Sequence, residues 1–141
     1  MITLQEVKIM GINAPRTHQR VIMRLAAELF FLYDKQKVIN LEPLPETMID
    51  EDSSSPVPDI MLVDNEQAET PVIIEITRTG SVKNDLKKLI SLIEESDYGI
   101  REGFVYDYKL NKWHKYKRGE GITSQNSSFC DAINIDLATL L

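Results

Sequence analysis

The chain contains 141 residues, of which 43% are hydrophobic and 27% charged, and its formal net charge is −6. This length suits one ordinary domain, residues 1–141, with a core of its own, and the composition excludes a disordered or fibrous chain. No stretch approaches the roughly twenty apolar residues of a membrane span, and the first ten residues lack the features of a signal peptide. We therefore expect a cytoplasmic protein without a membrane partner. The single cysteine, Cys130, excludes an internal disulfide and a cysteine-based zinc site.

The acidic excess lies in the first half of the chain. Residues 1–75 contain thirteen acids and six bases, whereas residues 76–141 contain nine acids and ten bases. Because phosphate binding depends on Lys and Arg, any surface for a polyanion is expected in the second half. Residues 109–118 contain five basic residues and no acid, although such a run can equally be a solvated hairpin. The basic residues that we expect to contact nucleic acid are Lys112, Lys115, Lys117 and Arg118.

Hydrophobic periodicity predicts the elements of the first third of the chain. Residues 2–9 alternate imperfectly between apolar and polar side chains, which predicts a short edge strand. Pro15 suits the first turn of a helix, and apolar residues then recur at three- and four-residue spacing, so an amphipathic helix is expected over residues 15–33. Residues 37–44 are expected to form a strand, and the acidic, serine-containing segment 45–58 a solvated loop.

Two apolar segments around a polar turn predict a β-hairpin. Residues 59–63 and 71–77 form its strands, and residues 64–70 form the turn. After Ser81, which is a candidate helix cap, apolar residues at helical spacing predict a second amphipathic helix over residues 82–93.

The last third of the chain predicts further strands. Residues 103–108 and 112–116 are expected to pair across a tight turn, followed by a loop over residues 119–128. Residues 133–137 form either a last strand or the lead into a terminal helical turn. This order predicts an α/β fold in which helices pack against a mixed sheet. Many functions share such an architecture, so the function has to be inferred from the site.

Two acidic residues lie on the strands of the predicted hairpin. Asp59 opens the first strand and Glu75 lies inside the second, each among apolar neighbours. A buried carboxylate is costly unless a cation or strong donors hold it. Two carboxylates on one hairpin suit Mg²⁺, which prefers oxygen ligands. The alternative is that both side chains face solvent or form salt bridges at the strand ends.

Six short motifs follow one another along the chain. They are T-H-Q-R at 17–20, P-D-I at 58–60, E-I-T-R at 75–78, K-K at 87–88, G-I-R-E-G-F-V-Y-D at 99–107 and I-N-I-D-L at 133–137. Their order resembles the PD-(D/E)XK nuclease superfamily, and within it the Uma-type family of restriction-endonuclease-like proteins. The likeness extends over residues 15–141. Each motif is short, and the order and spacing of all six carry the resemblance.

The resemblance implies an α/β fold with a restriction-endonuclease-like mixed central sheet flanked by helices, an αβββαβ core. It also implies a metal-dependent endonuclease that hydrolyses phosphodiester bonds. Asp59, Glu75 and the main-chain carbonyl of Ile76 would bind Mg²⁺ or Mn²⁺, and Glu42 is a candidate for a further ligand, directly or through water. The expected partner is a nucleic acid, DNA in preference to RNA, and a homodimer is compatible with the sequence.

The chain departs from the superfamily at the motif lysine. Thr77 stands in its place, so the catalytic lysine is expected on the next helix, as Lys87 or Lys88. Lys88 matches a D-x-x-K spacing from Asp85, whereas Lys87 lies one turn from Lys83. Both can also be ordinary solvated lysines beside an apolar stripe, so the choice between them stays open.

Other readings of the sequence compete with the nuclease. A catalytically inactive domain of the same fold could hold nucleic acid or another protein through residues 109–118, and a plain structural module is a third reading. On the first helix, His18 is expected to cap or to make a structural hydrogen bond, and Glu28 either to approach the site or to face solvent. The chain has neither a Gly-rich phosphate loop nor a nucleophile elbow, which excludes nucleotide-binding enzymes and serine hydrolases.

Overall fold

Two helices and a six-stranded mixed sheet make up most of the structure, a computed structural model that describes residues 15–51 and 55–141. The strand expected over residues 2–9 lies outside the described residues. The elements in chain order are α2 (Arg16–Phe30), a π-helical turn (Phe31–Lys35), β1 (Glu42–Pro45), β2 (Ile60–Asp64), β3 (Glu69–Thr77), a 3-10 turn (Thr79–Ser81), α3 (Val82–Glu95), β4 (Glu102–Asp107), β5 (Lys112–Lys117), β6 (Gly121–Ile122), β7 (Phe129–Cys130), β8 (Ile135–Asp136) and a last 3-10 turn (Leu137–Leu140).

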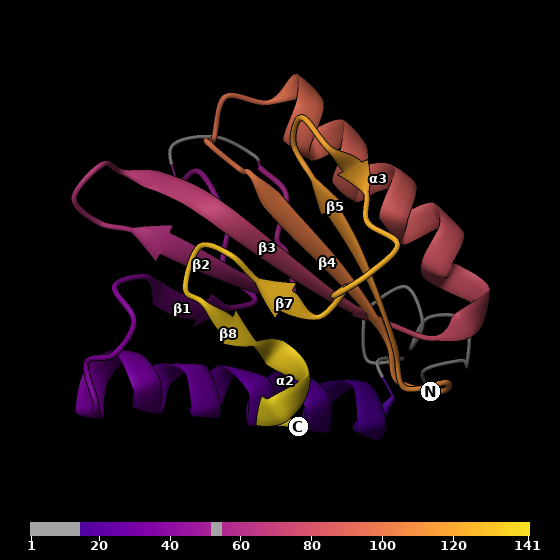
Figure 1. Ribbon diagram of the computed structural model, residues 1–141, viewed down its shortest axis with the longest axis horizontal. Coiled ribbons are helices and arrows are strands. Elements are labelled where there is room, and N and C mark those ends of the chain that lie inside the picture. The colour runs from indigo at the N-terminus through magenta and orange to yellow at the C-terminus, as the bar shows by residue number, and fades with distance from the viewer. Residues whose placement is uncertain (1–14, 52–54) are drawn as a thin grey trace, which may run out of the picture.

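The sheet has the strand order β1-β2-β3-β4-β5-β6, and β7 and β8 form a separate small hairpin. All neighbours in the large sheet are antiparallel except β3 and β4, which run parallel. A parallel pair needs a crossover connection, and α3 supplies it. Figure 1 shows α2 on one side of the sheet and α3 on the other. The expected α/β fold with a mixed sheet flanked by helices is therefore confirmed.

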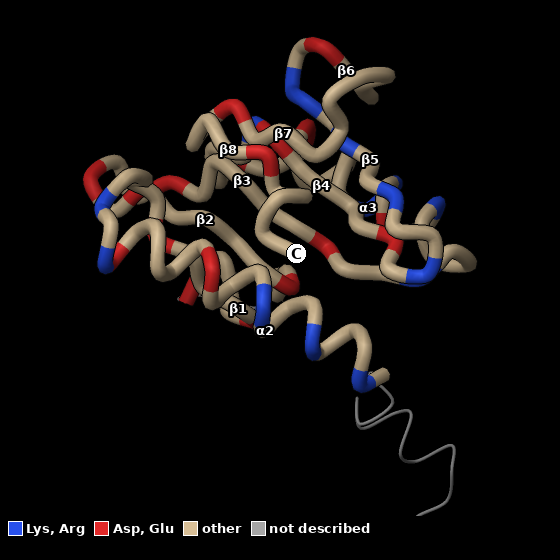
Figure 2. The backbone as a smooth tube through the Cα atoms, turned by 60° about the horizontal axis from the view of Figure 1, so that its bottom comes forward, with Lys and Arg blue, Asp and Glu red and all other residues tan. Residues whose placement is uncertain are grey.

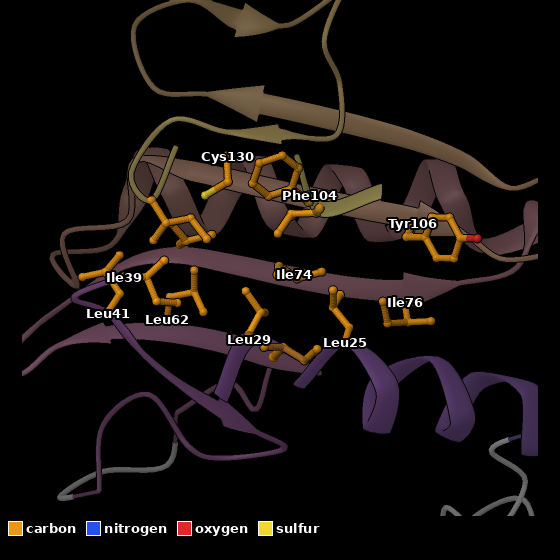
Figure 3. Close-up of a cluster of buried hydrophobic side chains, with 14 of the residues drawn as sticks. Leu25, Leu29, Ile39, Leu41, Leu62, Ile74, Ile76, Phe104, Tyr106 and Cys130 are labelled. Carbon is orange, nitrogen blue, oxygen red and sulfur yellow. The ribbon is translucent and has the colours of Figure 1, made fainter. Parts of the chain in front are cut away.

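One face of the sheet is buried beneath α2 and the C-terminal segment. Ile22, Leu25 and Leu29 recur at helical spacing on α2 and are at most 3% exposed. They belong to one apolar cluster with Ile74 of β3 and Leu137 of the last turn. Figure 3 shows side chains of this cluster lying between α2 and the strands. The cluster fixes α2 against the sheet.

The other face of the sheet packs against α3. Leu89 and Ile93 of the helix form a second cluster with residues of β3 and β4. Gly103 allows this close approach, because a Cβ atom built on it would lie only 2.7 Å from Cγ of Leu89. The two clusters place α2 and α3 on opposite sides of β3, the strand that carries Glu75.

We expect Gly103→Ala to destabilise the protein by about 1–3 kcal/mol, because the added methyl group forces α3 away from β4. The free energy of unfolding from urea titration measures the effect. Gly80→Ala is the matched control, since a Cβ at Gly80 has nothing within 4 Å. Equal stabilities of the two variants would contradict the packing described above.

The expected strand over residues 37–44 is wrong in its position. The strand β1 spans only Glu42–Pro45, and Lys37 has a positive φ of 54° that an extended strand does not allow. Ile39 and Leu41 are buried because they pack into the core before the strand begins. The pattern of apolar residues predicts which side chains are buried, but a buried residue does not have to pair with a neighbouring strand.

Two smaller expectations have different outcomes. Ser81 precedes α3, but its side chain makes no capping hydrogen bond. The end of the chain forms both a short strand, β8, and a helical turn, so the two alternatives for this segment occur in succession. In residues 15–51 and 55–141, no helix has the length and apolar character needed to cross a membrane.

Candidate metal centre

The β2–β3 hairpin brings Asp59 and Glu75 together. Ile60 lies opposite Ile74 in the antiparallel register, so the next pair along the hairpin is Asp59 and Glu75. Asp59 immediately precedes β2, and its Oδ2 atom accepts a hydrogen bond of 2.7 Å from the main-chain N–H of Ile76. The two strands are neighbours in one sheet, as the metal hypothesis requires.

Glu75 lies in an unfavourable environment for a charged carboxylate. Burial, followed by the negative charges of Asp59 and Asp85, raises the pKa of Glu75 to about 9. No Lys, Arg or His forms an ion pair with Glu75 in the part of the chain that the structure describes. A divalent cation between the carboxylates would remove both the burial penalty and the repulsion.

A cleft of about 660 Å³ opens beside Glu75. Asp85 and Lys88 of α3 line it together with Glu75, at a spacing of three residues along the helix. Lys87 does not line the cleft, because adjacent residues of a helix point in different directions. Asp85 was not among the expected site residues. Its position three residues before Lys88, in the first turn of α3, is the signal that could have identified it.

His18 of α2 also reaches the site. Its Nε2 atom lies 3.3 Å from Oδ2 of Asp59, and the two side chains are 18% and 20% exposed. The hydrogen bond with Asp59 raises the pKa of His18, against the opposing effect of burial. The Nδ1 atom of His18 is buried without a hydrogen-bond partner in the described residues. The imidazole therefore makes a structural hydrogen bond, as expected, but it makes this bond to a carboxylate of the candidate site.

Two other acidic candidates lie elsewhere. Glu42 faces Val63 across β1 and β2, at the opposite end of β2 from Asp59, and its Oε1 accepts a hydrogen bond from Asn65. It is thus removed from the candidate ligands, because Glu42 lies at the remote end of β1 and the strand runs from there toward the site, where Pro45 is opposite Ile60. Glu28 is exposed on α2. The acid at the site end of β1 is Glu46, whose N–H donates to the carbonyl of Asp59.

The basic segment is largely neutralised within the protein. Lys115 is buried and its Nζ lies 2.9 Å from Oε2 of Glu102 and 3.2 Å from Oδ2 of Asp131. Lys117 pairs with Asp131 at 2.7 Å and with Glu120 at 3.2 Å. The expectation that Lys115 contacts nucleic acid is wrong on this ground, and Lys117 is engaged as well. Of the four expected contacts, Lys112 and Arg118 are exposed and without an ion pair in the described residues.

The donor set suits a hard divalent cation. Asp59 and Glu75 offer carboxylate oxygens, and Ile76, which follows Glu75 on β3, offers a main-chain carbonyl. Mg²⁺ and Mn²⁺ prefer oxygen ligands of these types. The described residues contain no group of three His, Cys, Asp or Glu side chains gathered closely enough to hold a metal on their own. A bound ion would therefore keep several water ligands, as Mg²⁺ ordinarily does.

The comparisons with known proteins bear on the fold. Among solved structures, the chain is similar to a protein of Anabaena variabilis described as "a putative nuclease belonging to DUF820", with a TM-score of 0.62 and 14% sequence identity. The match covers 89% of this chain and 80% of that one. The likeness is one of fold. No protein-family model and no curated protein matches the chain.

We expect Glu75→Gln to stabilise the metal-free protein increasingly as the pH rises from 5 to 8. In the unfolded chain Glu75 loses its proton near its ordinary pKa of 4.5, whereas the folded protein retains it up to about 9. The folded state therefore binds more protons across this range, and the stability of the wild type falls with rising pH. Gln does not titrate, so its advantage should grow by about 1–3 kcal/mol in total. Urea titrations in EDTA at several pH values measure it, and parallel curves for both proteins would contradict the buried carboxyl.

Proposed function

We propose that the protein is a metal-dependent nuclease of the PD-(D/E)XK type that hydrolyses phosphodiester bonds in nucleic acid. The observation that carries the proposal is the pairing of Asp59 and Glu75 on the β2–β3 hairpin, where Glu75 and Lys88 line one cleft. The similarity in fold to a putative nuclease supports it. The short motifs that resemble the Uma-type family support the same activity, with DNA as the preferred substrate.

The residues of the site divide the chemistry among them. Asp59 and Glu75, with the Ile76 carbonyl, would hold Mg²⁺ or Mn²⁺, and His18 would fix the orientation of the Asp59 carboxylate through its hydrogen bond. The bound ion would supply Lewis-acid polarisation of a phosphoryl oxygen and a lower pKa for the attacking water. Lys88 would stabilise the negative charge that develops on the phosphate.

Thr77 supports this assignment of the lysine. It is 5% exposed on β3 and occupies the position of the superfamily's motif lysine. No ammonium therefore extends from β3 beside Glu75, and the cation has to come from another element. Lys88 is exposed, lines the cleft and forms no ion pair in residues 15–51 and 55–141. It is free to contact a phosphate.

The adjacent lysines give a matched test of the proposal. With Mn²⁺, the wild type should nick plasmid DNA, and EDTA should prevent it. Lys88→Ala should lower the rate by about a hundredfold, the effect of losing one donor to a developing charge, and Lys87→Ala should change it less than about twofold. Equal effects of both substitutions would contradict the role of Lys88. Metal-induced stabilisation without cleavage of DNA or RNA would instead indicate a catalytically inactive domain of this fold.

A further inference from the structure

The outer face of α2 carries exposed apolar residues that no described part of the chain covers. Ile22, Leu25 and Leu29 face the sheet, so the residues on the opposite side of the helix point to solvent. Met23 is 75% exposed and Phe31 is 48% exposed. Large apolar side chains gathered on one helix face are typical of an interface rather than of a solvated surface.

These residues form a symmetric pattern around Ala27. Met23 precedes Ala27 by four residues and Phe31 follows it by four, while Arg20 precedes it by seven and Asp34 follows it by seven. All five residues are exposed. We call them the α2 stripe. Spacings of four and seven residues return to nearly the same side of an α-helix, so Arg20, Met23 and Ala27 lie along one line of α2. Phe31 and Asp34 extend the α2 stripe into the π-helical turn that follows.

The charges along α2 are polarised. The basic residues Arg16, Arg20 and Arg24 all precede Ala27, and Figure 2 shows basic positions in succession along this part of the helix. Asp34 lies at the far end of the α2 stripe. Neither Arg20 nor Asp34 forms an ion pair in residues 15–51 and 55–141. Both therefore remain available to a partner molecule.

We propose that two copies of the chain pair through the α2 stripe, antiparallel, about a twofold axis at Ala27. Such an axis places Met23 of each copy against Phe31 of the other, and Arg20 of each copy beside Asp34 of the other. A self-complementary surface of this kind is what a twofold dimer requires. The small side chain of Ala27 at the crossing allows the helix axes to approach to about 8 Å.

A parallel arrangement is disfavoured by the same residues, because it would bring the three arginines of one copy against those of the other. Residues 16–35, the length of α2 and its π-helical turn, extend for about 30 Å, which gives the antiparallel contact an apolar centre and charged ends. The pairing does not depend on the proposed nuclease site.

Sedimentation equilibrium of the full chain over a wide range of concentrations tests the proposal. The wild type should associate to a dimer, and Ala27→Glu should be monomeric. Arg20→Asp and Asp34→Arg should each weaken association by about tenfold or more, and the double variant should recover most of the wild-type affinity because the pairs are reversed together. Circular dichroism verifies that each variant is folded.

Leu110→Ser is the matched control, since Leu110 is 63% exposed on the turn between β4 and β5 and lies outside the α2 stripe. It should dimerise like the wild type. A wild type that is monomeric at every concentration would overturn the proposal and assign the stripe to a different partner. A dimer that tolerates Ala27→Glu, or a double variant as weak as the single ones, would overturn it as well.

Discussion

Asp59→Ala and Glu75→Ala are each expected to lower the rate of Mn²⁺-dependent cleavage by about a thousandfold or more, because each removes a ligand from an ion that supplies several kcal/mol to the transition state. By contrast, Glu75→Ala is expected to raise the stability of the metal-free protein. The substitution removes a carboxyl group whose burial is unfavourable when it is ionised. Loss of activity together with retained stability separates a catalytic defect from unfolding.

Glu42→Ala is the control for these two variants. Glu42 is also an acidic residue at the start of a strand in the same sheet, but it lies at the opposite end of β2 from Asp59. The rate of cleavage by Glu42→Ala should stay within about twofold of the wild type, as for most surface substitutions. Cleavage that survives Glu75→Ala, or that is lost equally in Glu42→Ala, would contradict the assignment of the site.

Lys115→Met is expected to lower the free energy of unfolding by about 3–5 kcal/mol, because it leaves Glu102 buried without its counterion. The two side chains are 4% and 3% exposed. Glu102 accepts hydrogen bonds of 2.8 Å from the main-chain N–H groups of Asp131 and Ala132, so it cannot turn to solvent without releasing that loop. The loss should therefore extend to the packing of β7 against β4.

Urea titration measures this effect, with Lys112→Met as the control. Lys112 is exposed on the same strand and forms no ion pair in the described residues, so its substitution should change the stability by less than about 0.5 kcal/mol. Adding Glu102→Gln to Lys115→Met should recover part of the loss, because the uncompensated charge is removed. A loss below about 1 kcal/mol for Lys115→Met would contradict its role as a buried counterion.

The hairpin at the site could be predicted because its determinants are local. Two short apolar segments around a polar turn fix β2 and β3, and their antiparallel pairing brings Asp59 next to Glu75. Helical spacing likewise placed Lys88 on α3. Which of two adjacent lysines lines the cleft beside Glu75 depends on how α3 lies on the sheet. This is set by packing of Leu89 and its cluster rather than by the motif.

The errors concern residues whose partners are distant in the sequence. Lys115 belongs to a run without acids, but Glu102 lies opposite Lys117 on the neighbouring strand, and the loop at Asp131 folds back over both lysines. The contact of His18 with Asp59 joins α2 to β2 across 41 positions of the chain. Charge counts within a window cannot report such contacts, because the opposing charge comes from elsewhere in the fold.

A crystal structure of the protein grown with Mn²⁺ would show directly whether Asp59 and Glu75 bind a divalent cation. Anomalous diffraction locates Mn²⁺ without reference to activity. We expect a single strong anomalous peak within coordinating distance, about 2.0–2.4 Å, of carboxylate oxygens of both Asp59 and Glu75, and no such peak in Glu75→Ala crystals. A wild-type crystal saturated with Mn²⁺ that shows no peak between these two carboxylates would exclude the proposed metal site.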